Sequence, residues 1–181
     1  MKTYSFTLIL DVRKIDQSVE DALFEAGCDD GLLGSRGGVV YLDVQREAAS
    51  LQEAIRSAVQ NVQTAGFQVV RIEPDDLINA AEIARRTNRS RESIRQLAAG
   101  ERGPGGFPLP IASVTGTSPL WRWSDVVQWF VANQIAQQET CQEAETIRKI
   151  NAVLEVHRII PDLNEVADLW HSLALRPAAK Q

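Results

Sequence analysis

Residues 79–99 read NAAEIARRTNRSRESIRQLAA and carry the clearest structural pattern of the chain. The spacing predicts two short helices that cross at a steep angle, with Ala84 as the small residue where their backbones meet. Asn88 is placed for a turn with positive φ, because asparagine tolerates that conformation best after glycine. Ser90 is a suitable N-cap for the second helix. The apolar contact between the two helices is expected to involve Ile83, Ile94 and Leu97.

This stretch is similar to the helix-turn-helix of MerR-type regulators and of the excisionase and AlpA-like DNA-binding proteins. The similarity extends over residues 75–133, through GPGGFPLP at 103–110, LWRW at 120–123 and SDVVQWF at 124–130. In those families a proline-containing stretch follows the recognition helix, then a short hairpin called the wing, then a capped helix with an aromatic anchor. The resemblance therefore implies a winged helix-turn-helix domain that binds double-stranded DNA. Arg89 departs from the family, which has an aliphatic residue at that position.

The docking geometry of such domains gives roles to the polar residues of this segment. The start of the second helix faces the major groove, so the candidates for reading bases are Arg91, Glu92, Arg95 and Gln96. The candidates for contacting phosphate are Arg85, Arg86, Arg89, Ser90, Ser93, Arg102 and Arg122. Glu92 has an alternative role, in which it holds Arg95 or Arg89 in place, and each arginine also fits a merely solvated surface.

The distribution of charge agrees with a small basic face on an acidic protein. The whole chain has a formal net charge of −5. Residues 85–123 contain seven arginines against Glu92 and Glu101, which is near +5, so the remainder is near −10. Such a contrast suits contact with phosphate on one face while the other faces are repelled.

Residues 1–74 predict the order strand, helix, strand, strand, helix, strand. Apolar residues alternate from Tyr4 to Val12, as in a half-buried strand, and a helical stripe follows that ends at Gly27. A second amphipathic helix is expected to start at Ser50 and stop at Gly66. This βαββαβ order resembles the ferredoxin-like fold, which fits a dimerisation or sensing domain. The glycines between the elements are interpreted as turn residues, not as a nucleotide-binding loop: Gly31, Gly34, Gly37 and Gly38.

Residues 134–181 predict a pair of helices separated by Pro161. Such a pair does not bury its apolar stripe alone, so it is expected to pack on the other domains or on a second copy. The fold class expected for the whole chain is therefore α+β, with a ferredoxin-like domain, a central winged helix-turn-helix and C-terminal helices for dimerisation or partner binding.

The remaining residues do not indicate an enzyme, a metal site or a cofactor site. Cys28 and Cys141 are far apart in sequence, and His157 and His171 have no cluster of further ligands. No apolar run approaches the roughly 18 residues of a membrane span, and no secretory signal is expected, so a cytoplasmic location is predicted. The aromatic residues near the wing are expected to form core, not a base-stacking platform: Trp121, Trp123, Trp129 and Phe130.

The function expected from these patterns is sequence-specific binding of double-stranded DNA by a homodimer that regulates transcription. One such domain buries too little surface for tight specific binding, which favours a palindromic site read by two copies. Two alternatives remain open. One is an antitoxin-type protein that represses its own operon and binds a partner toxin; the other is a regulator that senses a small ligand.

Overall fold

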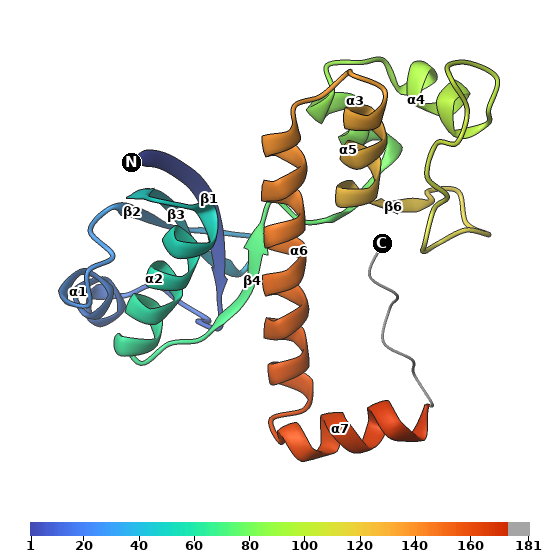
Figure 1. Cartoon of the computed structure of the whole chain (residues 1–181). Helices are drawn as coiled ribbons and strands as arrows, with labels where there is room; N and C mark the ends of the chain where they lie inside the picture. Colours follow the sequence, from blue (N-terminus) through green and yellow to red (C-terminus); the bar gives the residue numbers. More distant parts are fainter. Residues whose placement is uncertain (174–181) are drawn as a thin grey trace.

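The structure is a computed structural model that describes residues 1–173 and shows a mixed α+β chain with two hydrophobic cores (Figure 1). The first core lies beneath a four-stranded antiparallel sheet, and the second lies among short helices. A long helix, α6 (Gln138–Ile159), runs along both of them.

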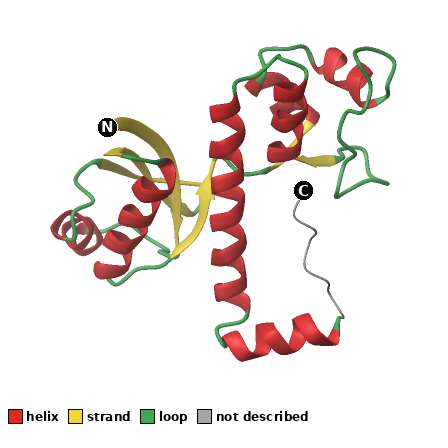
Figure 2. Ribbon diagram, in the orientation of Figure 1, coloured by secondary structure: helices red, strands yellow, loops and turns green. Residues whose placement is uncertain are grey.

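The sheet is formed by the N-terminal residues, and two helices cover one of its faces (Figure 2). The elements follow the predicted order: β1 (Lys2–Leu10), α1 (Gln17–Glu25), β2 (Gly31–Arg36), β3 (Val39–Ala48), α2 (Leu51–Thr64) and β4 (Val69–Glu73). The strand order across the sheet is β2-β3-β1-β4, so β2 and β4 are its edges. Leu8 lies between Leu42 and Ile72 in this register, and all three are buried.

Capping residues set the ends of α1 and α2. The Ser50 hydroxyl oxygen accepts a hydrogen bond from the Glu53 N–H at 3.2 Å, which starts α2 as predicted. Gly27 and Gly66 follow α1 and α2 closely, and both have a φ of +86°. Glycine adopts this left-handed conformation without the steric cost that a β-carbon brings. The predicted helix stops at these two glycines are confirmed.

The glycines between residues 31 and 38 are turn residues only in part. Gly37 and Gly38 form the turn between β2 and β3, but the prediction was wrong for Gly31 and Gly34, which lie within β2. A β-carbon on Gly31 would lie 2.8 Å from Cδ1 of Leu42, and one on Gly34 would lie 2.6 Å from the ring of Tyr41. Glycine is favoured at Gly31 because the side chain of buried Leu42 occupies the space that a β-carbon would fill, whereas at Gly34 the far end of the Tyr41 side chain would have to shift.

The second core is built from short elements that follow Asp76. They are β5 (Leu77–Asn79), α3 (Ala80–Arg86), α4 (Arg91–Ala98), β6 (Leu120–Arg122) and α5 (Trp123–Ala132), and β5 pairs with β6 in antiparallel fashion. Trp121, Trp123 and Phe130 are buried in this core, and Trp129 packs against it half-buried, as predicted for the aromatic residues.

Helix α6 packs on both cores. Cys141 and Ala144 are buried in the second core, and Ile147 is buried in the first. One turn further along, Asn151 is buried against the edge strand β4. Its Oδ1 accepts a hydrogen bond from the Ile72 N–H at 2.8 Å, and its Nδ2 donates to the Ile72 carbonyl at 2.8 Å. One side-chain amide thus pairs with the backbone of β4 as a neighbouring strand would.

The predicted helical pair at the C-terminus is present, and its two members differ. Helix α6 ends before Pro161, and α7 (Leu163–Ser172) follows. No residue of α7 is buried within the described part of the chain. Exposed apolar side chains lie on α7 and on the end of α6: Val153, Val156, Ile159, Leu163, Leu169, Trp170 and Leu173. Residues 174–181 of the predicted C-terminal segment lie outside the described residues.

Replacement of the buried amide is the direct test of the contact between α6 and β4. Asn151→Leu leaves the Ile72 N–H and carbonyl beside an apolar side chain, so we expect the free energy of unfolding to fall by about 2–4 kcal/mol. Urea denaturation followed by circular dichroism measures it. Asn164→Leu, on exposed α7, is the matched control and should change stability by less than about 0.5 kcal/mol. Equal effects of the two variants would contradict this account.

Candidate nucleic-acid interface

Helices α3 and α4 are joined by a tight turn whose hydrogen bonds explain the residues found there. Asn88 has a φ of +51°, as predicted. The Arg89 N–H donates to the Ala84 carbonyl at 2.9 Å, and the Asn88 N–H donates to the Arg85 carbonyl at 3.3 Å. This is the Schellman arrangement, in which a left-handed residue satisfies the last carbonyls of a helix. The Ser90 hydroxyl accepts from the Ser93 N–H at 3.1 Å, which confirms Ser90 as the N-cap of α4.

The two helices are held together by a buried apolar contact. Ile83 and Ile94 have no exposed surface, and Ala84 and Leu97 are also buried. Ala84 is buried in the same core as the predicted contact residues Ile83, Ile94 and Leu97. Since well-packed interiors resist rearrangement, the angle between α3 and α4 is set by these side chains.

Helix α4 lies at the end of the molecule opposite the four-stranded sheet (Figure 1). Its N-terminal residues Arg91 and Glu92 and the following Arg95 are exposed, whereas Gln96 is half-buried. No element within residues 1–173 covers this side of α4. The helix is therefore accessible to a partner along its first two turns.

The four base-reading candidates differ in how freely they can act. Arg95 donates to both oxygens of Glu92 at 2.8–3.1 Å and to both oxygens of Glu101 at 2.9 and 3.2 Å. Glu92 also accepts from the Gln96 side chain at 3.2 Å. The Arg95 hydrogen bond lowers the pKa of Glu92. Arg91, by contrast, forms no ion pair or hydrogen bond with residues 1–173 through its side chain. In the free protein Glu92 therefore holds Arg95, which is the alternative role considered for Glu92.

Arg85 and Arg86 share one carboxylate. Arg85 donates twice to Glu82, at 2.8 and 2.6 Å, and Arg86 donates to the same side chain at 2.8 Å. The Arg85 guanidinium, followed by that of Arg86, lowers the pKa of Glu82 from 4.5 to about 2. The Arg85 side chain is 71% exposed and that of Arg86 only 12%. Arg85 can therefore reach a partner, whereas Arg86 is largely enclosed.

Arg86 acts within the protein. Its Nη2 donates to the Asp75 carbonyl at 3.0 Å, and its guanidinium carbon lies 5.2 Å from the ring centroid of Trp123. Its Nη1 is buried without an acceptor among residues 1–173. These contacts hold α3 against the β4–β5 connection and α5. They favour a structural role over the predicted contact with phosphate.

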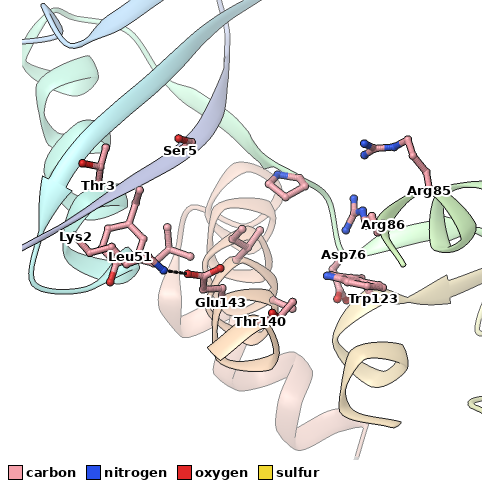
Figure 3. Close-up of a pocket in the computed structure, with 14 residues that line it drawn as sticks. Lys2, Thr3, Ser5, Leu51, Asp76, Arg85, Arg86, Trp123, Thr140 and Glu143 are labelled. Atoms are coloured by element: carbon pink, nitrogen blue, oxygen red, sulfur yellow. Dashed lines mark hydrogen bonds and ion pairs between the residues drawn. The ribbon is translucent and has the colours of Figure 1, made fainter. Parts of the chain in front are cut away.

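A cavity of about 410 Å³ lies where the two cores meet. Its walls come from β1, α3, α6 and the start of α5, and Arg85, Arg86 and Trp123 face it from one side (Figure 3). Lys2 lies on the other side, where its ammonium donates to Glu143 at 2.9 Å and to Glu139 at 2.6 Å. The cationic side chains that line the cavity are Lys2, Arg85 and Arg86, and each of them is already paired with a carboxylate.

Arg122 is paired with a buried acid that sequence reasoning did not single out. Asp76 is 6% exposed, and its Oδ1 accepts from the Ser124 N–H at 2.7 Å. Arg122 lies 3.5 Å and Arg148 3.9 Å from its other oxygen. Arg148 comes from α6, so this cluster also joins α6 to the second core. An acidic residue directly before a short strand was the available signal, but its partners lie 46 or more positions away.

The predicted wing is reduced to a single bridge. The Leu120 N–H donates to the Ala112 carbonyl at 3.0 Å, the Ala112 N–H donates to the Leu120 carbonyl at 3.4 Å, and residues 113–119 connect the two. The preceding glycine-rich loop is held by two indoles: Trp129 donates to the Gly105 carbonyl at 2.9 Å, and Trp121 donates to the Pro108 carbonyl at 3.0 Å. Phe107 is buried against Trp129, with ring centroids 5.1 Å apart.

The positive charge of this surface is more local than the sequence suggests. Acids neutralise four arginines: Glu82 binds Arg85 and Arg86, Glu92 and Glu101 bind Arg95, and Asp76 lies beside Arg122. The arginines without a carboxylate partner in the described part of the chain are Arg89, Arg91 and Arg102, and all three are exposed. Arg89 lies near the turn, where its guanidinium carbon is 5.5 Å from the Phe130 ring centroid.

The carboxylate that Arg85 and Arg86 share predicts a dependence of stability on pH. Because the pKa of Glu82 is lowered in the folded state, its contribution is complete above 4.5 and is lost as the pH falls towards about 2. Glu82→Gln should therefore reduce the free energy of unfolding at neutral pH, and its difference from wild type should shrink between these two values. Urea titrations across this range measure it. Glu20→Gln, at an exposed position of α1, is the control; a pH-independent difference for Glu82→Gln would refute the assignment.

Comparisons of the chain with protein-family models, curated proteins and solved structures find no match. Within residues 1–173 there is no helix with the length and apolar character needed to cross a membrane. The same residues contain no group of three or more histidine, cysteine, aspartate or glutamate side chains placed to hold a metal ion.

Proposed function

We propose that the protein binds double-stranded DNA in a sequence-specific way and regulates the transcription of neighbouring genes. The observation that supports this most is helix α4, which is N-capped by Ser90 and fixed at its base by Ile94 and Leu97. Its first turns are exposed and polar, and a protruding helix of this kind fits the major groove. The similarity of residues 75–133 to MerR-type and AlpA-like winged helix-turn-helix domains points the same way.

In the proposed complex the N-terminal end of α4 enters the major groove. Arg91 has no partner among the described residues and is the first candidate to contact guanine, while Gln96 suits adenine. Arg95 contacts a base only after it leaves Glu92 and Glu101. Glu92 is then free to accept a hydrogen bond from cytosine. Arg95 and Glu92 would thus exchange partners on binding.

Phosphate contacts in this proposal surround α4. Arg89 and Arg102 are exposed and without carboxylate partners among residues 1–173, and Arg85 is exposed beside Glu82. Ser90 and Ser93 lie at the N-terminus of α4, where backbone N–H groups and the helix dipole favour an anion. Arg86 and Arg122 are assigned instead to holding α3 and β6, because both are bound within the protein.

The proposed active species is a homodimer formed by α7 and the end of α6. The apolar side chains there include Leu163 and Trp170, which are 78% and 48% exposed. An isolated helix of ten residues is not stable in water, so its apolar side needs a partner. A second copy would supply that partner and would place two α4 helices on one duplex, as a palindromic site requires.

Three further proposals concern other parts of the chain. The strand order of residues 1–74 supports a ferredoxin-like class for that domain. The uncovered side of α7 also supports the antitoxin alternative, in which a partner protein occupies it. The cavity beside Arg86 and Trp123 supports a small-ligand sensor.

Substitution of the free arginine on α4 tests DNA binding. Arg91→Ala should weaken binding to a selected duplex by about 1–3 kcal/mol and relax the preference at one base pair. Fluorescence anisotropy at two salt concentrations measures both effects. Arg56→Ala, an exposed arginine on α2, is the matched control and should leave affinity unchanged. An equal loss on every duplex would make Arg91 a phosphate contact, and no loss would exclude α4 as the reading helix.

Substitution of the exposed indole on α7 tests the dimer. Trp170→Glu places a charge in the proposed apolar interface, so the species in solution should change from dimer to monomer, as measured by analytical ultracentrifugation. His171→Glu, at the next position of the same helix, is the control. A wild-type protein that is monomeric at micromolar concentration, or a Trp170→Glu variant that stays dimeric, would show that α7 has another role.

A further inference from the structure

The two edges of the four-stranded sheet are treated differently. At the β4 edge, α6 covers the strand and Asn151 pairs with the backbone of Ile72. At the other edge, β2 pairs with β3 on one side only, and no strand of residues 1–173 pairs with its outer side. Every second N–H and carbonyl along an edge strand points away from its neighbour, so β2 presents unpaired groups to the solvent.

Strand β2 lacks the features that usually protect an edge. It reads GLLGSR, with no proline and no charge before Arg36. Leu32 is 72% exposed, which is unusual for a leucine in a strand. Gly31 and Gly34 carry no side chain of their own, so neither adds bulk that would block a strand approaching the edge. The strand is accessible to an added strand along its whole length.

A groove of about 310 Å³ runs between β2 and α1. Its apolar wall includes Leu33 and Phe24, and the Phe24 side chain is 69% exposed. The charged residues that line it are Glu20, Asp21 and Asp29, all acidic, and no cation among the described residues lines it. A segment beside β2 would therefore direct alternate side chains toward carboxylates and an aromatic ring.

We propose that β2 and this groove bind an extended segment of a partner protein, which adds to the sheet as a fifth strand. The segment has lysine or arginine at alternate positions, facing Glu20, Asp21 and Asp29, and apolar residues between them, facing Leu32. Backbone pairing supplies affinity in this mode, and alternate side chains supply specificity. The proposal is independent of DNA binding, since α4 lies at the opposite end of the molecule.

The test uses the full chain and a heptapeptide with lysine and valine at alternating positions. We expect it to shift the backbone amide resonances of residues 31–36 in a saturable way in ¹⁵N–¹H spectra. A glutamate–valine peptide of the same pattern, and the lysine–valine peptide with a central proline, should leave these resonances unchanged. Glu20→Lys should lower the affinity for the lysine–valine peptide about tenfold, which corresponds to the loss of one charge pair at the surface. Glu25→Lys, on the same helix outside the groove, should not.

Three results would overturn the proposal. The first is the absence of shifts in β2 at roughly millimolar peptide. The second is an equal loss in Glu20→Lys and Glu25→Lys, which would mean bulk attraction to an acidic protein. The third is a shift of the β2 amides with protein concentration alone, which would make this edge a contact between two copies. DNA binding by the Glu20→Lys variant should equal that of wild type, so failure of either proposal is seen separately.

Discussion

Two hydrogen bonds between Asn151 and Ile72 attach α6 to the edge of the four-stranded sheet. A sheet edge that a helix covers needs a partner for its backbone groups, because water no longer reaches them, and a helix offers one only through a side chain. The Asn151 amide supplies this partner at β4, and the two hydrogen bonds constrain the position and the rotation of α6 relative to the sheet. Because the first turns of α6 also carry Cys141 and Ala144 into the second core, the same contact determines where α3 and α4 lie.

Ion pairing then decides which arginines remain available. Seven arginines between residues 85 and 123 suggest a broad basic face. The fold brings Glu82, Glu101 and Asp76 against four of them and leaves the positive charge mainly on Arg89, Arg91 and Arg102. An exposed arginine–carboxylate pair contributes little to stability, but it reduces the positive charge that a nearby DNA phosphate would encounter. The acids beside α4 therefore suit selective contact better than general attraction to nucleic acid.

Local features of this chain could be predicted from its sequence, and long-range ones could not. Ser50, Asn88 and Ser90 were predictable because a cap or a left-handed turn depends on a few adjacent residues. The roles of Asn151 and Asp76 were not, because their partners lie 79 and 46 positions away. Gly31 and Gly34 were mistaken for turn residues because only the register of β3 shows what fills their β-carbon space. The candidate site was found as a segment, but the free and the paired arginines were not distinguished.

In the proposed function, α4 reads base pairs as part of a two-fold assembly. Selection from a pool of random duplexes with the purified full chain, followed by sequencing, tests this. We expect enrichment of a site with two inverted halves, whose centres lie about one helical turn apart or a multiple of it. A pool that remains random after repeated selection at low salt would exclude sequence-specific reading by α4.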